Sequence, residues 1–301
     1  MRRLLLVCVV FGSFQSLFAQ QDPLYAQYLL NPMVINPAYA GLNNNFNGSV
    51  AYRKQWAGFD GSPTTFNVNG HMSMFDNKVG AGVLLVQDQL GITKNTEFQG
   101  AFSYKLQLKD NVLSFGMQGG FINFRNNTSN LTLDDPTDPV YVQNANVVKP
   151  NVGAGVILKS ERFIVGLSVP RMLPTKISDG GTEFQLYQQH FYLFGSYVFY
   201  LNERLRFKPS ALLRGVKGSP LSTDLNFNII VDGNYTGGIF TRNFNTYGLL
   251  VQALISKKFK LGYIFEVPTS SSVGVNYSTH EVFLGLILPV LKSHERSISN
   301  F

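Results

Sequence analysis

Apolar and polar residues alternate along several stretches of the chain. The alternation separates Phe46, Gly48, Val50 and Tyr52 from Asn47, Ser49, Ala51 and Arg53; Phe66, Val68, Gly70 and Met72 from Asn67, Asn69, His71 and Ser73; Phe98, Gly100, Phe102, Tyr104 and Leu106 from Glu97, Gln99, Ser103, Lys105 and Gln107; and Leu221, Thr223, Leu225, Phe227 and Ile229 from Ser222, Asp224, Asn226 and Asn228. A period of two is typical of strands with one face in an apolar medium and the other in a polar one. In a membrane barrel these media are lipid and lumen.

The pattern predicts an all-β fold: a transmembrane antiparallel β-barrel of about 14 strands, preceded by an irregular N-terminal segment. The strands are expected to begin near Phe46, Thr64, Val79, Thr93, Val112, Asn151, Arg162, Gln188, Arg204, Pro220, Tyr235, Thr246, Phe259 and His280. Those near Val79, Asn151 and Thr246 alternate weakly, so the count holds to within about two strands.

The predicted connections fall into two classes. Every second one is tight and centres on Asp76-Asn77, Lys109-Asp110-Asn111, Lys159-Ser160-Glu161, Leu201-Asn202-Glu203, Asp232-Gly233-Asn234 or Ser256-Lys257-Lys258. Asn, Asp and Gly suit such turns because they tolerate positive φ. The other set contains every long loop, the largest being 125–149, 171–186 and 267–279. Short periplasmic turns opposite long external loops are typical of a membrane barrel, and this arrangement leaves both barrel ends in the periplasm.

Residues 20–45 have no sustained period and contain Pro23, Pro32 and Pro37, so they are expected to form an irregular segment before the barrel. The domain organisation that follows is a signal peptide (1–19), a periplasmic or plug segment (20–45), the barrel (46–290) and a C-terminal periplasmic tail (291–301). A barrel of fourteen strands has a lumen wider than side chains alone fill. That lumen must hold water, an inserted segment or part of another protein.

The start of the chain resembles an export signal. Arg2 and Arg3 precede an apolar stretch, and cleavage is expected after Ala19. The alternative, a membrane anchor, conflicts with the short apolar run, which is interrupted by Gly12 and Ser13. The single cysteine, Cys8, lies within the signal, so the processed chain is expected to have no thiol, disulfide or cysteine–metal site.

Composition agrees with a membrane barrel. Charged residues make up only 14% of the chain, aromatic residues make up 13%, and there are 28 glycines, whereas soluble proteins carry about 25% charged residues. The net charge of +7 is compatible with acidic partners or lipid headgroups, or simply with a solvated surface. There is no dense basic tract, so we expect no nucleic-acid partner.

The segment after the signal resembles a known family. Asp22-Pro23-Leu24-Tyr25-Ala26-Gln27-Tyr28, then Asn31-Pro32 and Ile35-Asn36-Pro37-Ala38-Tyr39-Ala40-Gly41, are similar to the N-terminal box of the PorP/SprF family. Further matches are Arg53-Lys54-Gln55-Trp56 with Gly58, Gly61-Ser62-Pro63 and Thr65; Asp88 and Gly91; Pro209-Ser210; Asp224-Leu225-Asn226; and His280-Glu281. The extension from Lys292 to Phe301, beyond the last strand, departs from the expected pattern.

The resemblance implies a non-enzymatic outer-membrane barrel of the type IX secretion system of Bacteroidetes, a system often linked to gliding motility. Family members are associated with export or surface anchoring of large secreted adhesins, through the adhesin's C-terminal region, and with periplasmic secretion or gliding components. The alternative function is a general or selective porin, which the composition alone equally allows.

The box supplies most of the candidate partner-binding residues: Asp22, Pro23, Tyr25, Gln27, Tyr28, Asn31, Pro32, Asn36, Pro37, Tyr39 and Gly41. Proline at two positions makes the path rigid and pushes the preceding asparagines into extended conformations. A rigid non-helical segment must lie against protein or water and not lipid, so we expect it in the periplasmic mouth or lumen. It either braces the barrel or forms a docking surface for a periplasmic component.

The other candidate partner-binding residues lie on the predicted strands. Arg53 falls on the luminal face, where it contacts cargo or pairs with a carboxylate such as Glu97 or Asp224. Trp56 is expected at the lipid–water interface. A basic stripe of Arg204, Arg206, Lys208 and Arg214, joined by Arg242 and Lys260, either attracts an acidic segment of a secreted protein or forms a solvated pore wall.

Three glycines, Gly116, Gly119 and Gly120, permit either close approach by a plug or strand curvature. The four histidines have no metal-binding spacing, no G-x-S-x-G motif is present, and Ser73 with His71 is a poor catalytic pair. Residues 134–138 form an acidic loop that is compatible with weak calcium binding, although a solvated loop explains it better. We therefore expect no enzymatic activity and no cofactor.

Overall fold

The computed structural model describes residues 26–127, 145–179, 182–269 and 277–289. Three short 3-10 helices come first, η1 (Ala26–Leu29), η2 (Pro32–Val34) and η3 (Pro37–Tyr39). They are followed by β1 (Asn45–Lys54), β2 (Thr64–Met74), β3 (Val79–Leu90), β4 (Thr93–Leu108), β5 (Asn111–Asn126), β6 (Ala145–Lys159), β7 (Phe163–Val169), β8 (Thr175–Asp179), β9 (Thr182–Tyr187), β10 (His190–Tyr197), β11 (Phe199–Tyr200), β12 (Leu205–Val216), β13 (Ser222–Val231), β14 (Tyr235–Arg242), β15 (Thr246–Ile255), β16 (Phe259–Pro268) and β17 (Thr279–Pro289). Within these ranges, no helix has the length and apolar character needed to cross a membrane.

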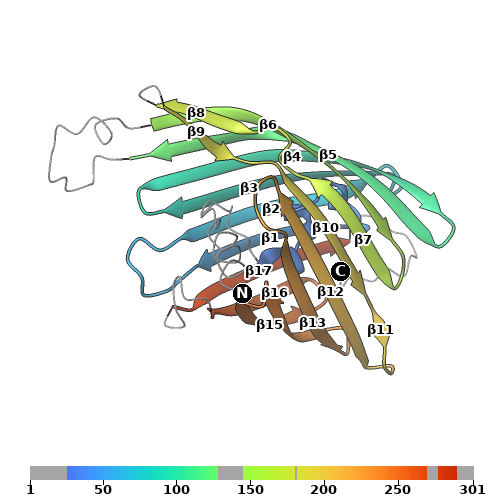
Figure 1. Cartoon of the computed structure of the whole chain (residues 1–301). Coiled ribbons are helices and arrows are strands. Elements are labelled where there is room, and N and C mark those ends of the chain that lie inside the picture. Colours follow the sequence, from blue (N-terminus) through green and yellow to red (C-terminus); the bar gives the residue numbers. More distant parts are fainter. Residues whose placement is uncertain (1–25, 128–144, 180–181, 270–276, 290–301) are drawn as a thin grey trace, which may run out of the picture.

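The main sheet closes on itself as a barrel (Figure 1). Neighbouring strands pair in antiparallel fashion, β1 pairs with β17, and a pairing between β10 and β12 completes the ring. The pair β10 and β11 acts as one strand interrupted at Val198, since both pair with β12. The wall therefore has fourteen strands, as the sequence predicts. Closure removes the sheet edges, so backbone groups of the wall pair without water.

The two faces of the wall have opposite character, and the predicted faces are confirmed. In β2, Asn67, Asn69, His71 and Ser73 are buried inside, and β13 buries Ser222, Asp224, Asn226 and Asn228 in the same way. The outer face carries large exposed apolar side chains, including Val83, Phe102, Phe115, Leu167, Phe227, Ile239, Leu249 and Val282. A continuous apolar outer surface of this kind suits contact with lipid chains.

The predicted tight turns lie at one end of the barrel, called here the tight-turn end. Positive φ occurs in four of them, at Asp76, Asn77, Lys109, Asp232, Gly233, Ser256 and Lys257 among other residues. The turn after β10 and β11 uses Asn202 instead, whose Oδ1 accepts hydrogen bonds from the N–H groups of Arg204 and Leu205. The opposite end carries all the longer connections and is called the long-loop end.

Two predictions of strand position are wrong. β6 begins at Ala145 and not near Asn151, because its first residues pair with β5 as far as Asn126. The expected loop 171–186 contains the hairpin of β8 and β9, which forms a separate two-stranded sheet. Both errors affect segments at the long-loop end, where no alternating lipid and lumen faces mark a strand.

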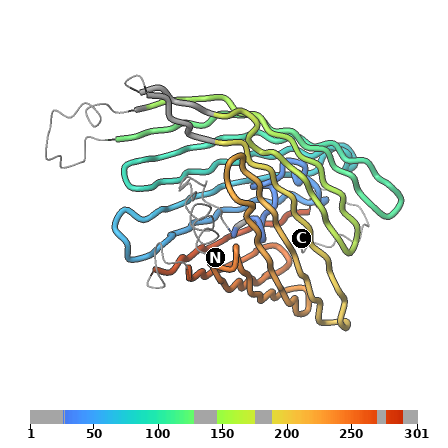
Figure 2. The backbone as a smooth tube through the Cα atoms, in the orientation of Figure 1, coloured from blue at the N-terminus to red at the C-terminus, as the bar shows by residue number. Residues whose placement is uncertain are grey.

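The residues before β1 lie inside the ring, where Figures 1 and 2 show the blue start of the described chain enclosed by strands. We call residues 26–43 the luminal segment. Its Asn31 and Asn36 have extended backbones, with φ of −149° and −143°, as the following prolines predict. Their side-chain oxygens accept hydrogen bonds from the N–H groups of Met33 and Ala38. Each asparagine thereby caps a single helical turn that begins with proline.

Glycines in the wall make room for this segment. A Cβ added at Gly116 of β5 would lie 2.1 Å from Ala38 N, and one at Gly80 of β3 would lie 1.9 Å from Ala40 O. The predicted close approach is thus confirmed for Gly116. At Gly119, in contrast, a Cβ would meet no atom within 4 Å, and at Gly120 it would meet the neighbouring strand β4.

We predict that Gly116→Val displaces the luminal segment without opening the barrel. The added side chain overlaps Ala38, and overpacking of this kind costs ~1–3 kcal/mol. Chymotrypsin should then cleave the segment about tenfold faster or more, while the heat-dependent shift in gel mobility typical of a folded barrel persists. Gly119→Val on the outer face is the matched control and should cleave at the wild-type rate. Equal cleavage of the two variants would contradict the packing.

Candidate functional site

Side chains of the wall bind successive carbonyl groups of the luminal segment. Ser168 of β7 donates a hydrogen bond to Ile35 O, Ser114 of β5 to Ala38 O, and Ser103 of β4 to Ala40 O, each at 2.7 Å. Lys105 Nζ of β4 donates to Gly41 O. A non-helical segment has no internal partners for most of its carbonyl groups, so these donors replace the water that burial removes.

The segment returns hydrogen bonds to the wall. Asn36 Nδ2 donates to Val156 O of β6 at 3.3 Å and to Leu167 O of β7 at 3.2 Å. The amide of Gly41 donates to His71 Nδ1 of β2 at 3.0 Å, and Asn43 Oδ1 accepts from Lys159 Nζ of β6 at 2.7 Å. Together with the donors above, these bonds reach five different strands and hold the segment in one position.

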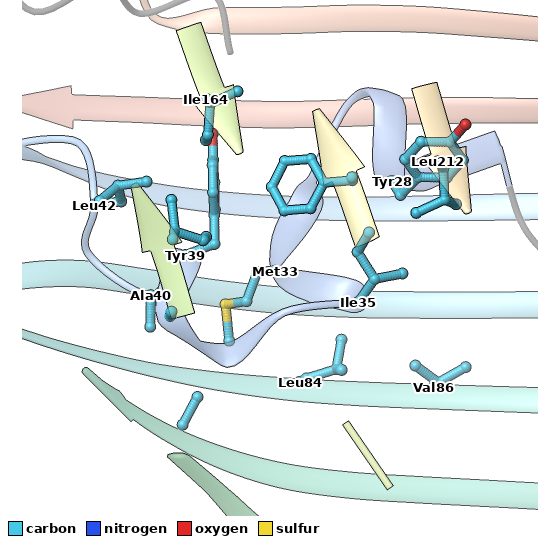
Figure 3. Close-up of a cluster of buried hydrophobic side chains, with 14 of the residues drawn as sticks. Tyr28, Met33, Ile35, Tyr39, Ala40, Leu42, Leu84, Val86, Ile164 and Leu212 are labelled. Atoms are coloured by element: carbon cyan, nitrogen blue, oxygen red, sulfur yellow. The ribbon is translucent and has the colours of Figure 1, made fainter. Parts of the chain in front are cut away.

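Apolar packing accompanies these bonds (Figure 3). The buried cluster combines Tyr28, Met33, Ile35, Tyr39, Ala40 and Leu42 of the segment with Leu84, Val86, Ile157, Ile164 and Leu212 of the wall, among other residues. Burial raises the pKa of the Tyr39 phenol to about 12, so this ring packs as a neutral group. Cavities beside the segment have volumes of about 20, 40 and 30 Å³, which is room for one to a few water molecules.

A buried ionic network lies nearer the long-loop end. Arg53 of β1 forms a bidentate pair with Glu266 of β16, at 2.8 and 3.0 Å, and also reaches Glu281 of β17 at 3.4 Å. Arg242 of β14 binds Asp224 of β13 at 3.1 Å and lies 3.7 Å from Glu266. The Arg53, Glu266 and Glu281 side chains are at most 5% exposed. Buried charges require such partners, because unpaired ones are strongly disfavoured.

Tyr28 connects the luminal segment to this network. Its hydroxyl donates to Asp224 Oδ2 at 3.3 Å and accepts from Asn226 Nδ2 at 3.0 Å. Burial, and secondarily the nearby Asp224 carboxylate, raise the pKa of the Tyr28 phenol, so the ring stays neutral and donates. The segment is therefore bonded to the wall at both ends of its described path.

The structure pairs Arg53 with a luminal carboxylate, which was one of its two predicted roles, but the predicted partners are wrong. Its carboxylates are Glu266 and Glu281, which β1 meets because it pairs with β17 at the closure of the ring. Asp224 pairs with Arg242, and Glu97 pairs with Arg171, which lies 2.5 Å away in the connection after β7. Two of these partners, Glu266 and Arg171, had not been singled out from the sequence. For Glu266, the available signal was its inward-facing position in the alternation of β16.

The predicted basic stripe is not one continuous surface. Arg204 is an exposed rim residue that pairs with Asp232 at 2.7 Å, a hydrogen bond that lowers the pKa of the Asp232 carboxyl. Arg206 lies over the Tyr200 ring, 5.2 Å from its centroid. Lys208 and Lys260 line a cavity beside the segment. Arg214 is buried, and Arg242 belongs to the ionic network.

The remaining candidates divide by position. Pro32, Pro37, Asn31, Asn36 and Tyr39 are all buried in the luminal segment. Gly41, at φ +60°, contacts the backbone of β2 and β3 so closely that a side chain would collide. Gln27 lies in η1. Asp22, Pro23 and Tyr25, the expected signal peptide, the acidic loop 134–138 and the C-terminal tail lie outside the described residues.

Trp56 lies just beyond β1, at the long-loop end. Its backbone adopts φ +52°, and its N–H donates to Thr279 Oγ1 of β17 at 3.3 Å. The indole is partly exposed. This position at the end of the wall suits the predicted role at a lipid–water interface.

A serine–histidine contact lies at the outer face, where the sequence pattern does not predict one. Ser278 Oγ lies 2.9 Å from His280 Nε2, and His280 Nδ1 lies 2.7 Å from the Tyr263 hydroxyl. A neutral phenol does not stabilise an imidazolium as a carboxylate does, so we interpret the group as a clamp between β16 and β17. Ser73 does not form a catalytic pair with His71; its hydroxyl forms hydrogen bonds with Asn77 and Lys105. Within the described residues, no group of three or more His, Asp or Glu side chains is placed to hold a metal ion.

We predict that Arg53→Met strongly destabilises the barrel. The substitution removes the cation that two buried carboxylates share, of which Glu266 keeps only a 3.7 Å contact with Arg242. Breaking a buried pair in this way costs ~3–5 kcal/mol. Adding Glu266→Gln should recover part of the loss, as measured by urea unfolding in detergent. Arg204→Met breaks an exposed pair and should leave the unfolding midpoint unchanged. Similar effects of the two single substitutions would contradict the buried network.

Comparison with known proteins places the chain in a family. The profile described as type IX secretion system membrane protein PorP/SprF matches residues 17–286. Comparison with curated proteins gives no match. Among solved structures, the chain is similar to the Acinetobacter baumannii outer membrane protein Omp33, with 10% identity over 82% of this chain and 99% of that chain, and a TM-score of 0.46.

Two further solved structures are similar at the same remote level. They are the CymD monoaromatic hydrocarbon channel (9% identity, 88% of this chain and 92% of that chain, TM-score 0.46) and a mutant of the Rh. blastica porin (9% identity, 81% and 99%, TM-score 0.36). These likenesses are too distant to bear on function. The profile match covers nearly the whole barrel and the luminal segment, and the chain belongs to the PorP/SprF family of type IX secretion system membrane proteins.

Proposed function

We propose that this protein is a non-enzymatic outer-membrane component of type IX secretion that works by binding other proteins. It takes part in the export or surface anchoring of a secreted adhesin and docks periplasmic secretion or gliding components. Family membership supports the secretion role. The observation that favours a binding role over a conducting one is the packing of residues 26–43 within the lumen by hydrogen bonds to at least five strands.

The alternative function is a porin. A solute pathway needs a wide aqueous lumen, whereas here a rigid segment with a buried apolar cluster lies across the interior. Three cavities lined by described residues have volumes of about 20–40 Å³, which suits water and not a larger solute. The lumen therefore supports a binding function better than a conducting one.

The buried residues of the N-terminal box brace the barrel in this proposal. The buried side chains of Asn31, Asn36 and Tyr39 contact the segment itself and the wall. They therefore have little exposed surface for binding a partner. Periplasmic docking then falls to the residues just before Ala26, with Asp22, Pro23 and Tyr25, and to the tight-turn rim. The tight-turn end faces the periplasm in this arrangement, and the longer connections face outward toward the adhesin.

We predict that the intact barrel conducts poorly. In planar lipid bilayers the wild-type protein should show little steady ion conductance, because the luminal segment fills the interior. Deletion of residues 20–41 should produce stable open channels if the wall still folds. Gly119→Val serves as a control for altering the wall without moving the segment. A large steady conductance of the wild-type protein would favour the porin.

We also predict that a short N-terminal deletion removes docking of the periplasmic component and leaves the bracing of the barrel intact. Removing residues 20–25 leaves every described anchor of the luminal segment in place, so the barrel should fold with normal stability. Affinity purification from native membranes should then recover less of the periplasmic component while the adhesin remains. Undiminished recovery of every partner by this variant would remove the docking role of residues 20–25.

A further inference from the structure

A row of polar residues crosses the outer face of β1 to β6 at the long-loop end. Each residue of the row is the direct partner of the next on the neighbouring strand: Lys54, Thr64, Gln89, Lys94, Arg125 and Asn146. Their chain neighbours Arg53, Thr65 and Asp88 face the lumen, where Arg53 and Thr65 are buried and Thr65 donates to Asp88. Since side chains alternate along a strand, the row faces outward. We call it the outer polar row.

An apolar surface lies next to this row, on the side toward the middle of the barrel. Phe98 and Phe121 are direct partners on the same outer face, four residues from Lys94 and Arg125 on β4 and β5. The two rings are 39% and 45% exposed, and their centroids are 5.7 Å apart. Four residues of a tilted strand span a height of about 10 Å. A headgroup layer is about 5–8 Å thick and long cationic side chains bend toward it, so both charges reach headgroup level.

Within the outer polar row, two cations face each other. Lys94 and Arg125 are direct cross-strand partners, and like charges in such positions, with Cβ atoms about 5 Å apart, destabilise a sheet. The carboxylates of the neighbouring strands point the other way, since Asp88 bonds Thr65 and Glu97 bonds Arg171. Across the described ranges, neither cation forms an ion pair or a side-chain hydrogen bond. The repulsion between them is therefore not offset by the chain itself.

The surroundings of this pair are suited to a phosphate group. A guanidinium group binds phosphate through two parallel hydrogen bonds, and an ammonium group binds it as a point charge. The amide groups of Gln89 and Asn146 lie on the two flanking strands, in register with the cations, and amides donate further hydrogen bonds. An anionic headgroup placed here brings its acyl chains to Phe98 and Phe121. The face is thus complementary to an amphiphile, and not to an anion alone.

We propose that Lys94 and Arg125 bind the phosphate group of an anionic lipid in the leaflet at the long-loop end, with the lipid's acyl chains on Phe98 and Phe121. The phosphate bridges the two cations and relieves their repulsion. A phosphate monoester suits the pair best, because it carries about −1.5 to −2 charges at neutral pH. In the arrangement proposed above, this leaflet is the outer one. The site does not depend on the secretion role, since it lies on the outer wall and not in the lumen.

The test uses dioleoyl phosphatidic acid, a phosphate monoester with two acyl chains, and the intact barrel in a neutral detergent. Native mass spectrometry measures the affinity of lipid binding. Wild-type protein should bind the lipid, and Lys94→Met with Arg125→Met should weaken binding by about tenfold or more, because the charge-assisted bonds are lost. The matched control is Lys257→Met with Lys258→Met, which removes two exposed cations from the turn before β16 and should bind as wild type does. Equal affinities of the two double variants would overturn the proposal.

Competition separates the contributions of the headgroup and the chains. Dioleoylglycerol has the same chains without the phosphate, and glycerol 3-phosphate has the headgroup without the chains. Neither should displace phosphatidic acid from the wild-type protein at equal concentration. Displacement by glycerol 3-phosphate would assign the site to a soluble phosphate, and displacement by dioleoylglycerol would assign the binding to apolar contact alone. Either result would contradict a site for an anionic lipid.

Thermal unfolding gives a second, independent measurement. In lipid-free detergent, Lys94→Met should unfold at a temperature no lower than wild type, because the substitution removes a like-charge contact. Added phosphatidic acid should raise the unfolding temperature of wild type more than that of Lys94→Met, since a ligand of the folded state stabilises it. Lys94→Arg keeps the charge and should respond to the lipid as wild type does. A lower unfolding temperature of Lys94→Met without lipid, or an equal response of all three proteins to the lipid, would contradict the site.

Discussion

A strand exposed to lipid must pair every backbone N–H and C=O group within the protein, and the rest of this structure follows from that constraint. Fourteen strands meet it by closing a ring through β10 and β12. A ring of this size encloses more space than its own inward side chains fill. Residues 26–43 occupy that space, and their backbone then needs partners as well. The serines, lysine and histidine that face inward from β2, β4, β5 and β7 provide them.

The wall and the luminal segment are therefore matched to each other at the level of single residues. Gly80 and Gly116 leave space where the backbone of the segment approaches most closely, and Asn36 completes hydrogen bonds to two strands. Tyr28 extends the match to the ionic network of Arg53, Glu266, Glu281, Arg242 and Asp224. Removing one charge from such a network lowers the stability of the fold by more than the ion pair contributes to it, because the partner charge stays buried without its counter-charge. This asymmetry favours one fixed position of the segment over several loose ones.

The sequence predicted the wall well because lipid and lumen impose the period of two that reveals strands and their faces, as in β2 and β13. It also predicted the extended asparagines, since the effect of a proline on the preceding residue is local. It did not predict the partners of Arg53, because closure brings Glu266 and Glu281 to β1 from more than 200 residues away. The start of β6 and the hairpin of β8 and β9 were missed, since neither has the alternation that lipid enforces. The sequence also did not show that the basic stripe is divided among different surroundings. That division depends on strand register and on the path of the luminal segment, and no local pattern encodes either.

The central claim is that residues 26–43 are a fixed part of the barrel interior. Amide hydrogen exchange of the purified protein in detergent tests it most directly, with the amides of Ala38 and Gly41 followed individually. Their hydrogen bonds to Asn36 Oδ1 and His71 Nδ1 predict protection that approaches that of the strand amides in β2 and β5. Exchange of these two amides at the rate of an unstructured peptide, with the strands still protected, would contradict the account.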